Sequence, residues 1–216
     1  MCFEVMFFDL DETLYPSNTG IWQAIGNRMD EYIQNELMIP GQEVTDLRNE
    51  LFHQYGTTLR GLREVYGINE NEFLRFVHDI PIQDYLKRDD VLINTLSQYS
   101  SKKVIFTNAD SGHAHRVLSN LGIERFFDTV IDIQTIHPYC KPMKEAFQLA
   151  LASVGVKSTA NCVMIDDSDR NLKAAHELGF FTIRVGTEDR SPFVDAAIAN
   201  IKLLPEVIPV STRISQ

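Results

Sequence analysis

The chain has 216 residues, of which 44% are hydrophobic and 23% charged, as in ordinary globular proteins. This composition excludes disordered, collagen-like and coiled-coil classes, and the formal net charge of −10 disfavours a nucleic-acid polymer or an anionic membrane as partner. Residues 3–8 form a short run, apolar except at Glu4, that ends at Asp9. A continuous apolar run of this length, closed by a turn residue, predicts a strand that is buried on both faces.

A helical segment is predicted after this first strand. In residues 16–88 no convincing strand is present, and apolar side chains recur at the spacing of a helix face. The three patterns are Ile21, Ile25, Met29, Ile33 and Leu37; Val44, Leu47, Leu51 and Tyr55; and Phe73, Phe76 and Val77. The sequence therefore predicts a helical bundle inserted directly after the first strand.

Strand-like and helical patterns alternate in the remainder of the chain. Further strands are predicted at four apolar runs, residues 103–106, 129–132, 161–165 and 180–185. Helices closed by a glycine are predicted at residues 110–121, 142–154 and 168–178, with Pro142 in the first turn of the second. We therefore predict an α/β fold in which residues 1–15 and 89–216 form a parallel sheet with covering helices, and residues 16–88 form the insert.

Polar side chains follow the predicted strands, at the end of a parallel sheet where ligands bind. They are Asp9, Asp11, Thr107, Asn108, Asp166 and Asp167, with Lys141 in the loop before a helix. Any one of them alone is explained by a helix cap, a turn or an exposed position. Their joint occurrence at successive strand ends indicates a functional site.

Phosphoryl transfer is the chemistry that this set can perform. Four carboxylates repel one another unless a cation joins them, and Mg²⁺ takes hard oxygen ligands together with a substrate phosphate. Asp9 is then placed to attack phosphorus, and Asp11 to act as general acid and base. Thr107, through its hydroxyl, and Asn108, through its backbone N–H, are candidates to hold phosphate oxygens. Lys141 is the candidate to neutralise negative charge on the nucleophile and the phosphate.

The same residues resemble the four motifs of the haloacid dehalogenase-like superfamily of hydrolases. Residues 9–16 (DLDETLYP) are similar to its first motif, DxDxT; residues 106–108, 141–142 and 166–171 are similar to the second, third and fourth. The resemblance implies a Rossmann-like core with a C1-type cap inserted after the first strand. That arrangement agrees with the helical bundle expected from the periodicity.

The resemblance also implies roles for the acidic residues. It makes Asp9 the nucleophile and a magnesium ligand, and Asp11 the acid and base with its backbone carbonyl on the metal. It makes Asp167 a further ligand, and Asp166 either another ligand or the holder of a metal-bound water. Asn171 stands where some relatives have an aspartate, so its role stays open between the metal site and a hydrogen bond within the protein.

An acid at position 11 favours a phosphatase or a phosphomutase. Dehalogenases of the superfamily lack an acid there because no leaving oxygen needs a proton, and its ATP-driven pumps carry threonine. A phosphomutase binds two phosphates, and Arg60 and Arg63 in the insert keep that option open. We expect a Mg²⁺-dependent phosphomonoesterase. The alternatives are a phosphatase or phosphomutase for another small metabolite such as a phosphosugar and, against the intact motifs, a non-catalytic binding protein.

Within the superfamily the chain resembles the pyrimidine 5′-nucleotidase-like branch. The resemblance rests on residues 55–62, 76–78, 84–87 and 105–110. It implies hydrolysis of nucleoside monophosphates such as UMP or CMP. The sequence does not decide between a monomer and a homodimer. Thr57 and Thr58 are candidate substrate contacts, with a capped helix start at Thr57 as the equal alternative. Tyr15 and Trp22 are candidates to stack on a base, with simple packing between cap and core as the more common role of such residues. His78 is expected to be structural.

The other reactive side chains indicate no further site. The three cysteines, Cys2, Cys140 and Cys162, form neither a disulfide framework nor a zinc pattern, and His113, His115 and His137 lack metal-ligand spacing. No apolar run approaches the roughly 20 residues of a membrane-spanning helix. Acidic residues close the first apolar run, so no signal peptide is predicted. We expect a cytoplasmic protein.

Overall fold

Six parallel strands form one sheet in the order β3-β2-β1-β4-β5-β6 in the computed structural model, which describes residues 3–210. The strands are β1 (Val5–Phe8), β2 (Lys102–Phe106), β3 (Thr129–Ile131), β4 (Cys162–Asp166), β5 (Phe181–Val185) and β6 (Ala196–Ile198). The five predicted strands are β1 to β5, so the predicted α/β class with a parallel sheet is confirmed. The sequence did not predict β6, which has only three residues and pairs with β5 at the sheet edge. Cys2 lies outside the described residues.

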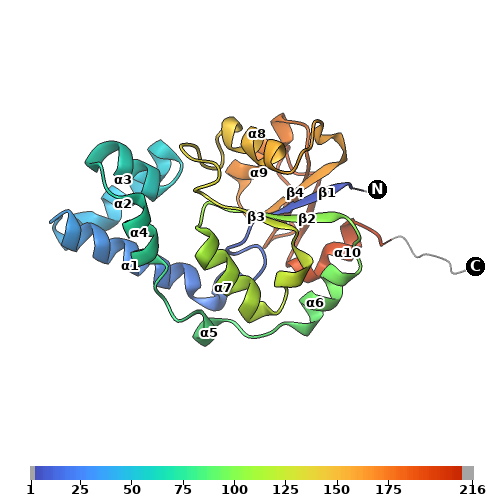
Figure 1. The fold of residues 1–216 in the computed structure, drawn as a ribbon, viewed down its shortest axis with the longest axis horizontal. Helices are drawn as coiled ribbons and strands as arrows, with labels where there is room; N and C mark the ends of the chain where they lie inside the picture. Colours follow the sequence, from blue (N-terminus) through green and yellow to red (C-terminus); the bar gives the residue numbers. More distant parts are fainter. Residues whose placement is uncertain (1–2, 211–216) are drawn as a thin grey trace, which may run out of the picture.

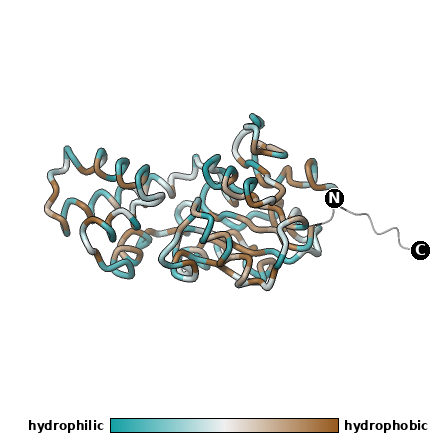
Figure 2. Tube along the Cα trace, turned by 90° about the horizontal axis from the view of Figure 1, so that it is seen from above, coloured by the Kyte–Doolittle hydropathy of each residue, from teal (hydrophilic) through white to brown (hydrophobic). Residues whose placement is uncertain are grey.

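The first strand lies at the centre of this sheet and is buried along its whole length. Val5 pairs with β2 on one side and with β4 on the other, and the register continues to Phe8. The ring of Phe7 lies edge-on to Phe106 and Phe180, with centroids 6.4 and 5.6 Å apart. Figure 2 shows hydrophobic stretches, in brown, inside the larger part of the molecule, which contains the sheet. Burial on both faces explains the continuous apolar run, and it fixes the strand ends that carry the site.

Helices cover both faces of the sheet. They are α6 (Asp90–Ser97), α7 (Ser111–Leu121), α8 (Lys144–Ser153), α9 (Asp169–Glu177) and α10 (Leu204–Val207). Figure 1 shows α8 and α9 on one side of the strands and α6 and α7 on the other. The predictions at residues 110–121 and 168–178 are confirmed within a residue at each end. The helix predicted at residues 142–154 begins later, at Lys144, because Pro142 lies in the loop that carries Lys141.

A separate group of helices follows β1. It contains α1 (Ile21–Glu36), α2 (Gly41–Tyr55), α3 (Thr58–Tyr66) and α4 (Glu70–Val77), and the short α5 (Ile82–Tyr85) leads back to the sheet. We call α1 to α4 the helical insert; these helices pack on one another at one end of the molecule (Figure 1). The periodicity predicted three of the four, and α3 is the helix it missed. A Cβ at Gly61 of α3 would lie 2.7 Å from Leu51 Cβ, so this glycine lets α2 and α3 approach closely.

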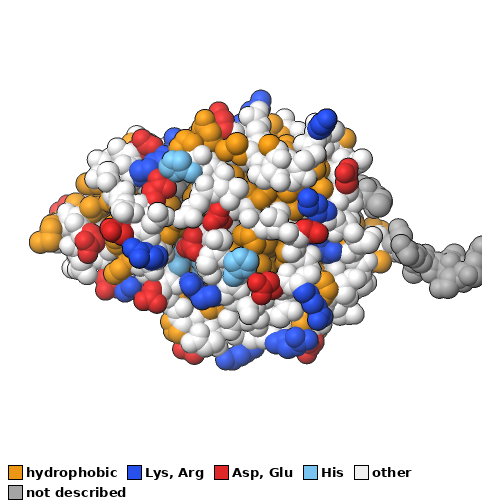
Figure 3. Space-filling view, in the orientation of Figure 1, with side chains coloured by type: hydrophobic (Ala, Val, Ile, Leu, Met, Phe, Trp, Pro, Cys, Tyr) orange, Lys and Arg blue, Asp and Glu red, His pale blue; other side chains and the backbone are white. Residues whose placement is uncertain are grey.

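Figure 3 shows acidic and basic side chains interspersed over the face in view, without a continuous basic patch. No helix in residues 3–210 is both long enough and apolar enough to cross a bilayer.

Candidate active site

The carboxyl ends of β1, β2 and β4 bring the predicted polar residues to one edge of the sheet. The backbone N–H of Asp9 donates to Ile165 O at 2.9 Å, and that of Thr107 donates to Ile131 O at 3.0 Å. Asp166 is the last residue of β4 and is fully buried. Hydrogen bonds between neighbouring strands therefore fix the backbone positions from which these side chains project.

Lys141 lies between two of the acidic side chains. Its Nζ donates to Asp9 Oδ1 at 2.7 Å and to Asp166 Oδ2 at 2.9 Å, and the residue is 1% exposed. The loop that carries it is held by Asn108, whose side chain donates to Lys141 O at 3.0 Å and accepts from Lys141 N at 2.8 Å. The side chain of Asn108 thus fixes this loop. The backbone N–H of Asn108 donates to no group within residues 3–210.

Burial governs the protonation of these groups. It raises the pKa of Asp9 to about 6, with Lys141 opposing and Asp167 adding to the shift. It likewise raises the pKa of Asp166 to about 6 and that of Asp167 to about 7. Burial alone would lower the pKa of Lys141, but the facing Asp166 and Asp9 outweigh burial and raise it. One charged ammonium therefore faces three carboxyl groups that resist ionisation.

Replacement of Lys141 by methionine is expected to destabilise the metal-free protein by about 3–5 kcal/mol at pH 8, since it leaves buried carboxylates without their cation. The loss should shrink near pH 5, because the pKa values of Asp9 and Asp166 lie near 6 and both groups then take up protons. Urea unfolding at both pH values measures the difference. Lys144→Met, at an exposed position, is the matched control. An equal loss at the two pH values would contradict this account.

Asp166 and Asp167 differ in how far their oxygens are already occupied. Both oxygens of Asp166 accept from Asn171 Nδ2 at 3.1 Å, and Oδ1 also accepts the backbone N–H of Ser168 at 2.8 Å. Asp167 Oδ1 accepts only the hydroxyl of Thr13, at 3.2 Å, among residues 3–210. Asn171 therefore hydrogen-bonds within the protein, which was the simpler of its two predicted roles. Asp167 keeps more oxygen lone pairs free than Asp166.

The three carboxyl groups form an arrangement that suits a hard cation. Asp9, Asp166 and Asp167 each offer one oxygen, and the three oxygens lie within 4.8 Å of one another. The donor set contains only oxygen, and full ionisation would leave negative charge in excess of the single ammonium of Lys141. Such a set fits a divalent ion such as Mg²⁺ better than it fits a softer metal.

Asp11 lies beside this cluster and is held by two side chains. His113 Nε2 donates to Asp11 Oδ1 at 2.8 Å, and the Tyr15 hydroxyl donates to the same oxygen at 2.5 Å. Burial by itself raises the pKa of Asp11, but His113 and the Tyr15 hydroxyl outweigh burial and hold that pKa below its usual range. Tyr15 is 3% exposed, so it has the packing role that was the more common of its two interpretations and is not open to stack on a base. Sequence reasoning also missed the contact of His113 with Asp11.

A second histidine supports the first. His78 directly follows α4, and its ring stacks on that of His113 with centroids 4.4 Å apart and planes 19° apart. Its Nδ1 pairs with Asp110, the residue that caps the N-terminus of α7. His78 is buried and hydrogen-bonded, in agreement with the structural role expected for it.

A cavity of about 510 Å³ lies between the strand ends and the helical insert. Its floor is formed by the predicted residues Asp9, Asp11, Thr107, Asn108, Lys141 and Asp167. The insert contributes a mixed wall, with the apolar and aromatic side chains of Trp22, Met29, Phe52, Leu59, Phe73, Leu74 and Val77 beside the polar side chains of Gln23, Arg48 and Asn49. Thr57 and Thr58 also line the cavity, and Thr57 caps α3 by accepting the N–H of Arg60 at 3.1 Å. Thr57 therefore caps α3, as one of its two interpretations expected, and its contact with a substrate stays a prediction.

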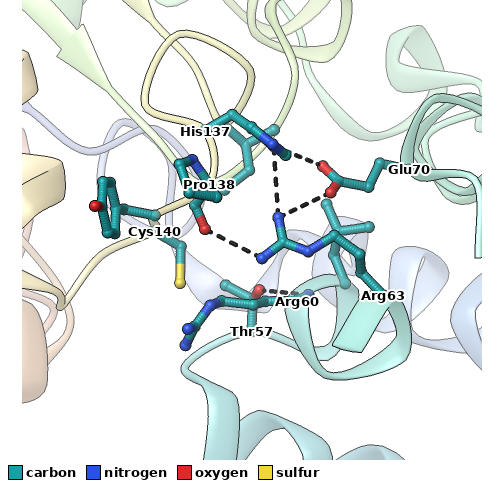
Figure 4. Close-up of a pocket in the computed structure, with 10 residues that line it drawn as sticks. Thr57, Arg60, Arg63, Glu70, His137, Pro138 and Cys140 are labelled. Carbon is teal, nitrogen blue, oxygen red and sulfur yellow. Dashed lines mark hydrogen bonds and ion pairs between the residues drawn. The ribbon is translucent and has the colours of Figure 1, made fainter. Parts of the chain in front are cut away.

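A much smaller hollow, of about 10 Å³, lies where α3 meets the loop before Lys141 (Figure 4). Arg63 donates to Glu70 Oε1 at 2.9 Å and to Pro138 O at 3.2 Å, and His137 Nδ1 lies 3.4 Å from Glu70 Oε2. This hollow has room for about one water. Its contacts join the helical insert to the loop that carries Lys141.

The chain matches the haloacid dehalogenase-like hydrolase family over residues 3–179. It belongs to this family. Over 190 residues it is 30% identical to Phosphate metabolism protein 8 of Saccharomyces cerevisiae, covering 82% of this chain and 59% of the yeast protein. It is 25% identical to a glyceraldehyde 3-phosphate phosphatase of Methanocaldococcus jannaschii, covering 83% of each chain. The fold is similar to that of the hydrolase YfnB of Bacillus subtilis, with a TM-score of 0.64, 18% identity and coverage of 97% and 100%.

Proposed function

We propose that this hydrolase is a Mg²⁺-dependent phosphomonoesterase that works through a phosphorylated Asp9. The observation that carries the proposal is that two carboxyl groups with different contacts line the same cavity. Asp9 contacts the buried ammonium of Lys141 at 2.7 Å, and Asp11 accepts hydrogen bonds through a single oxygen. One group suits attack on phosphorus and the other suits proton transfer. The similarity to a glyceraldehyde 3-phosphate phosphatase supports the same reaction class.

The two groups act in sequence in this mechanism. A carboxylate oxygen of Asp9 attacks phosphorus, the bond from phosphorus to the ester oxygen breaks, and Asp11 gives that oxygen a proton. Water then attacks the phosphorylated Asp9 and gives a proton back to Asp11, and inorganic phosphate leaves as Asp9 is restored. Thr107 and the backbone N–H of Asn108 hold the phosphate oxygens. Lys141 stabilises the charge that develops beside Asp9.

The proposed magnesium site consists of Asp9, Asp167 and the backbone carbonyl of Asp11, with Asp166 in contact with Lys141. A bound Mg²⁺ supplies positive charge that neutralises the clustered carboxylates and the phosphate. Asp166 then serves chiefly to hold Lys141, because its oxygens already accept hydrogen bonds from Asn171 and the backbone. YfnB, which has a similar fold, was crystallised with bound magnesium.

Mg²⁺ is expected to raise the melting temperature, and to do so more at pH 8 than at pH 5.5. In the metal-free protein the pKa values of Asp9, Asp166 and Asp167 are raised to about 6, 6 and 7. Since these values exceed those of the unfolded chain, the three groups contribute stability at low pH that is lost as pH rises from about 4 to 7. Bound Mg²⁺ offsets this loss of stability. Below pH 6, protons compete with Mg²⁺ for the three carboxylates. Differential scanning fluorimetry with Mg²⁺ or EDTA measures the shift, and a larger shift at pH 5.5 would contradict the site.

The cavity wall bears on the substrate. We propose that residues 16–88 act as a cap over the core formed by residues 1–15 and 89–216, and that the cap selects the group carried by the phosphate. Trp22 is 48% exposed and Phe52 is 39% exposed, and both line the cavity beside Asn49. Aromatic rings with a nearby amide suit the stacking and hydrogen bonding of a nucleobase. This supports pyrimidine nucleoside 5′-monophosphates as substrates.

A phosphatase for a small sugar phosphate is the second candidate, and the similarity to the archaeal glyceraldehyde 3-phosphate phosphatase favours it. The phosphomutase alternative has weaker support. Arg63, one of two arginines considered for a second phosphate, instead bonds Glu64, Glu70 and Pro138. The other, Arg60, donates to Tyr55 O at 3.1 Å.

A panel of phosphate esters, with Mg²⁺ or with EDTA, tests the function. Phosphate release from UMP and CMP that disappears on chelation and returns with Mg²⁺ is the expected result. Turnover of glyceraldehyde 3-phosphate without turnover of UMP or CMP would overturn the nucleotide assignment and leave the phosphatase. Full activity without any divalent metal would overturn the mechanism.

A further inference from the structure

The two oxygens of Asp11 have different environments. Oδ1 accepts one hydrogen bond from His113 Nε2 and a second from the Tyr15 hydroxyl. Oδ2 accepts none from any group in residues 3–210, and it is not among the buried atoms that lack a partner. Because Asp11 lines the cavity, Oδ2 is the oxygen left open to it. The arrangement separates a held oxygen from a free one within a single carboxyl group.

The ring of His113 makes no other hydrogen bond within residues 3–210. The residue is 0% exposed, and its Nδ1 is buried without a hydrogen-bond partner in the part of the chain that the structure describes. Since an ionised Asp11 accepts and cannot donate, Nε2 must carry the hydrogen of this bond. A side chain needed only for packing at this position would be apolar, because a buried polar group without partners is costly. The hydrogen bond to Asp11 therefore explains why a histidine occupies this buried position.

The position of this ring is itself fixed from two directions. Asp110 Oδ1 accepts the backbone N–H of His113 at 2.9 Å, which sets the start of α7. The other oxygen of Asp110 holds His78, whose ring lies flat against His113 with centroids 4.4 Å apart. His78 O in turn accepts from Arg116 at 2.7 Å. The imidazole that reaches Asp11 has little freedom to turn.

We propose that His113 is a positioning residue for proton transfer, with Tyr15 as its partner on the same oxygen. The inference rests on the proposed role of Asp11 as acid and base. By occupying Oδ1 in both protonation states of Asp11, the two donors place the transferable proton on Oδ2, which faces the leaving oxygen. Neither His113 nor Tyr15 touches the substrate or exchanges a proton with it.

The test compares two phosphate esters that differ in their need for a proton on the leaving oxygen. The leaving group of an alkyl ester such as UMP is an alkoxide, which needs the proton. The leaving group of p-nitrophenyl phosphate is p-nitrophenolate, which is stable without one. His113→Leu is expected to lower kcat/KM for the alkyl ester by about 10- to 100-fold, part of the 10²–10⁴ that general acid–base catalysis contributes. kcat/KM for the aryl ester should hardly change. His113→Gln, which keeps an N–H donor near the position of Nε2, should recover most of the loss.

His115→Gln on the same helix is the matched control, because His115 is exposed and pairs only with Glu124 among the described residues. Equal losses for the two esters in His113→Leu would show a merely structural role and overturn the proposal, as would no loss for either. Should His113→Leu fail to fold, Tyr15→Phe is judged by the same two criteria. If Asp11→Asn leaves the alkyl ester rate unchanged, the acid–base role itself fails, which is a failure of the proposed function.

Discussion

Asp9→Asn is expected to abolish turnover of every phosphate ester, by about 10⁴-fold or more, the scale seen when a covalent nucleophile is removed. An amide oxygen is a poor nucleophile, and it also loses the charge that a metal ligand needs. The protein should still fold, because the pKa of Asp9 is already raised to about 6 by burial and the neutral amide has the same shape. Phosphate release under Mg²⁺, with Tm as a check of folding, measures the outcome.

Asp90→Asn is the control for this substitution, because Asp90 is an exposed aspartate on α6 and pairs only with Arg88 in the described part of the chain. Its rate should equal that of the unchanged protein. A second measurement distinguishes a lost nucleophile from lost binding. After brief reaction and acid quench, intact-mass analysis should show one added phosphoryl group on the unchanged protein and none on Asp9→Asn. A phosphorylated Asp9→Asn variant, or one that retains metal-dependent hydrolysis, would refute the assignment of Asp9.

The strands were predictable because burial on both faces leaves a direct trace in the sequence. Residues 5–8, 102–106 and 162–166 lie between sheet neighbours, and most of their positions are apolar, with Lys102, Lys103 and Asp166 at the strand ends as the exceptions. β6 left no such trace, since Ala196–Ile198 is three residues at the sheet edge. The helical periodicity missed α3 for a related reason, although Thr57 was considered as a helix cap. The nine residues of α3 contain one short apolar face, and its packing depends on the backbone approach at Gly61.

The floor of the site could be located from the sequence for a topological reason. Parallel strands end at the same edge, so residues that follow Phe8, Phe106 and Ile165 must meet there whatever the loops do. The contacts behind that floor could not be located in this way. Whether His113 faces Asp11 or the solvent depends on the rotation of α7, which the cap at Asp110 fixes.

Two contacts of the site, those of Tyr15 with Asp11 and of Asn108 with Lys141, could have been predicted from the local sequence. Tyr15 is four residues after Asp11 in a turn closed by the bond from Leu14 N to Leu10 O at 3.0 Å, which brings the hydroxyl back to the carboxylate. Asn108 was considered for its backbone N–H, yet its side chain also pairs with the backbone of Lys141. An amide side chain directly after a strand is well suited to hold a neighbouring loop, because it both donates and accepts.

Asp11→Asn is expected to lower kcat/KM for an alkyl phosphate by about 10²- to 10⁴-fold, the usual contribution of general acid–base catalysis. The asparagine keeps the shape of the side chain and can still accept from His113 and Tyr15 through its carbonyl oxygen, but its NH₂ group has no acidic proton to give. For p-nitrophenyl phosphate the first step should proceed, since phenolate leaves unprotonated. The second step should stall, because water has lost its base. The pKa of Asp11, held below its usual range, suits that second step, in which the ionised group accepts a proton.

This difference between the two steps predicts a burst. On mixing with p-nitrophenyl phosphate, Asp11→Asn should release about one nitrophenolate per active site quickly and then turn over slowly, while the phosphoryl group stays on Asp9. Stopped-flow absorbance together with intact-mass analysis measures both events. Glu12→Gln is the matched control, because Glu12 is the next residue and lines the same cavity, and the mechanism gives it no part. A steady rate without a burst, with the alkyl ester cleaved at the unchanged rate, would show that Asp11 neither gives nor takes the proton.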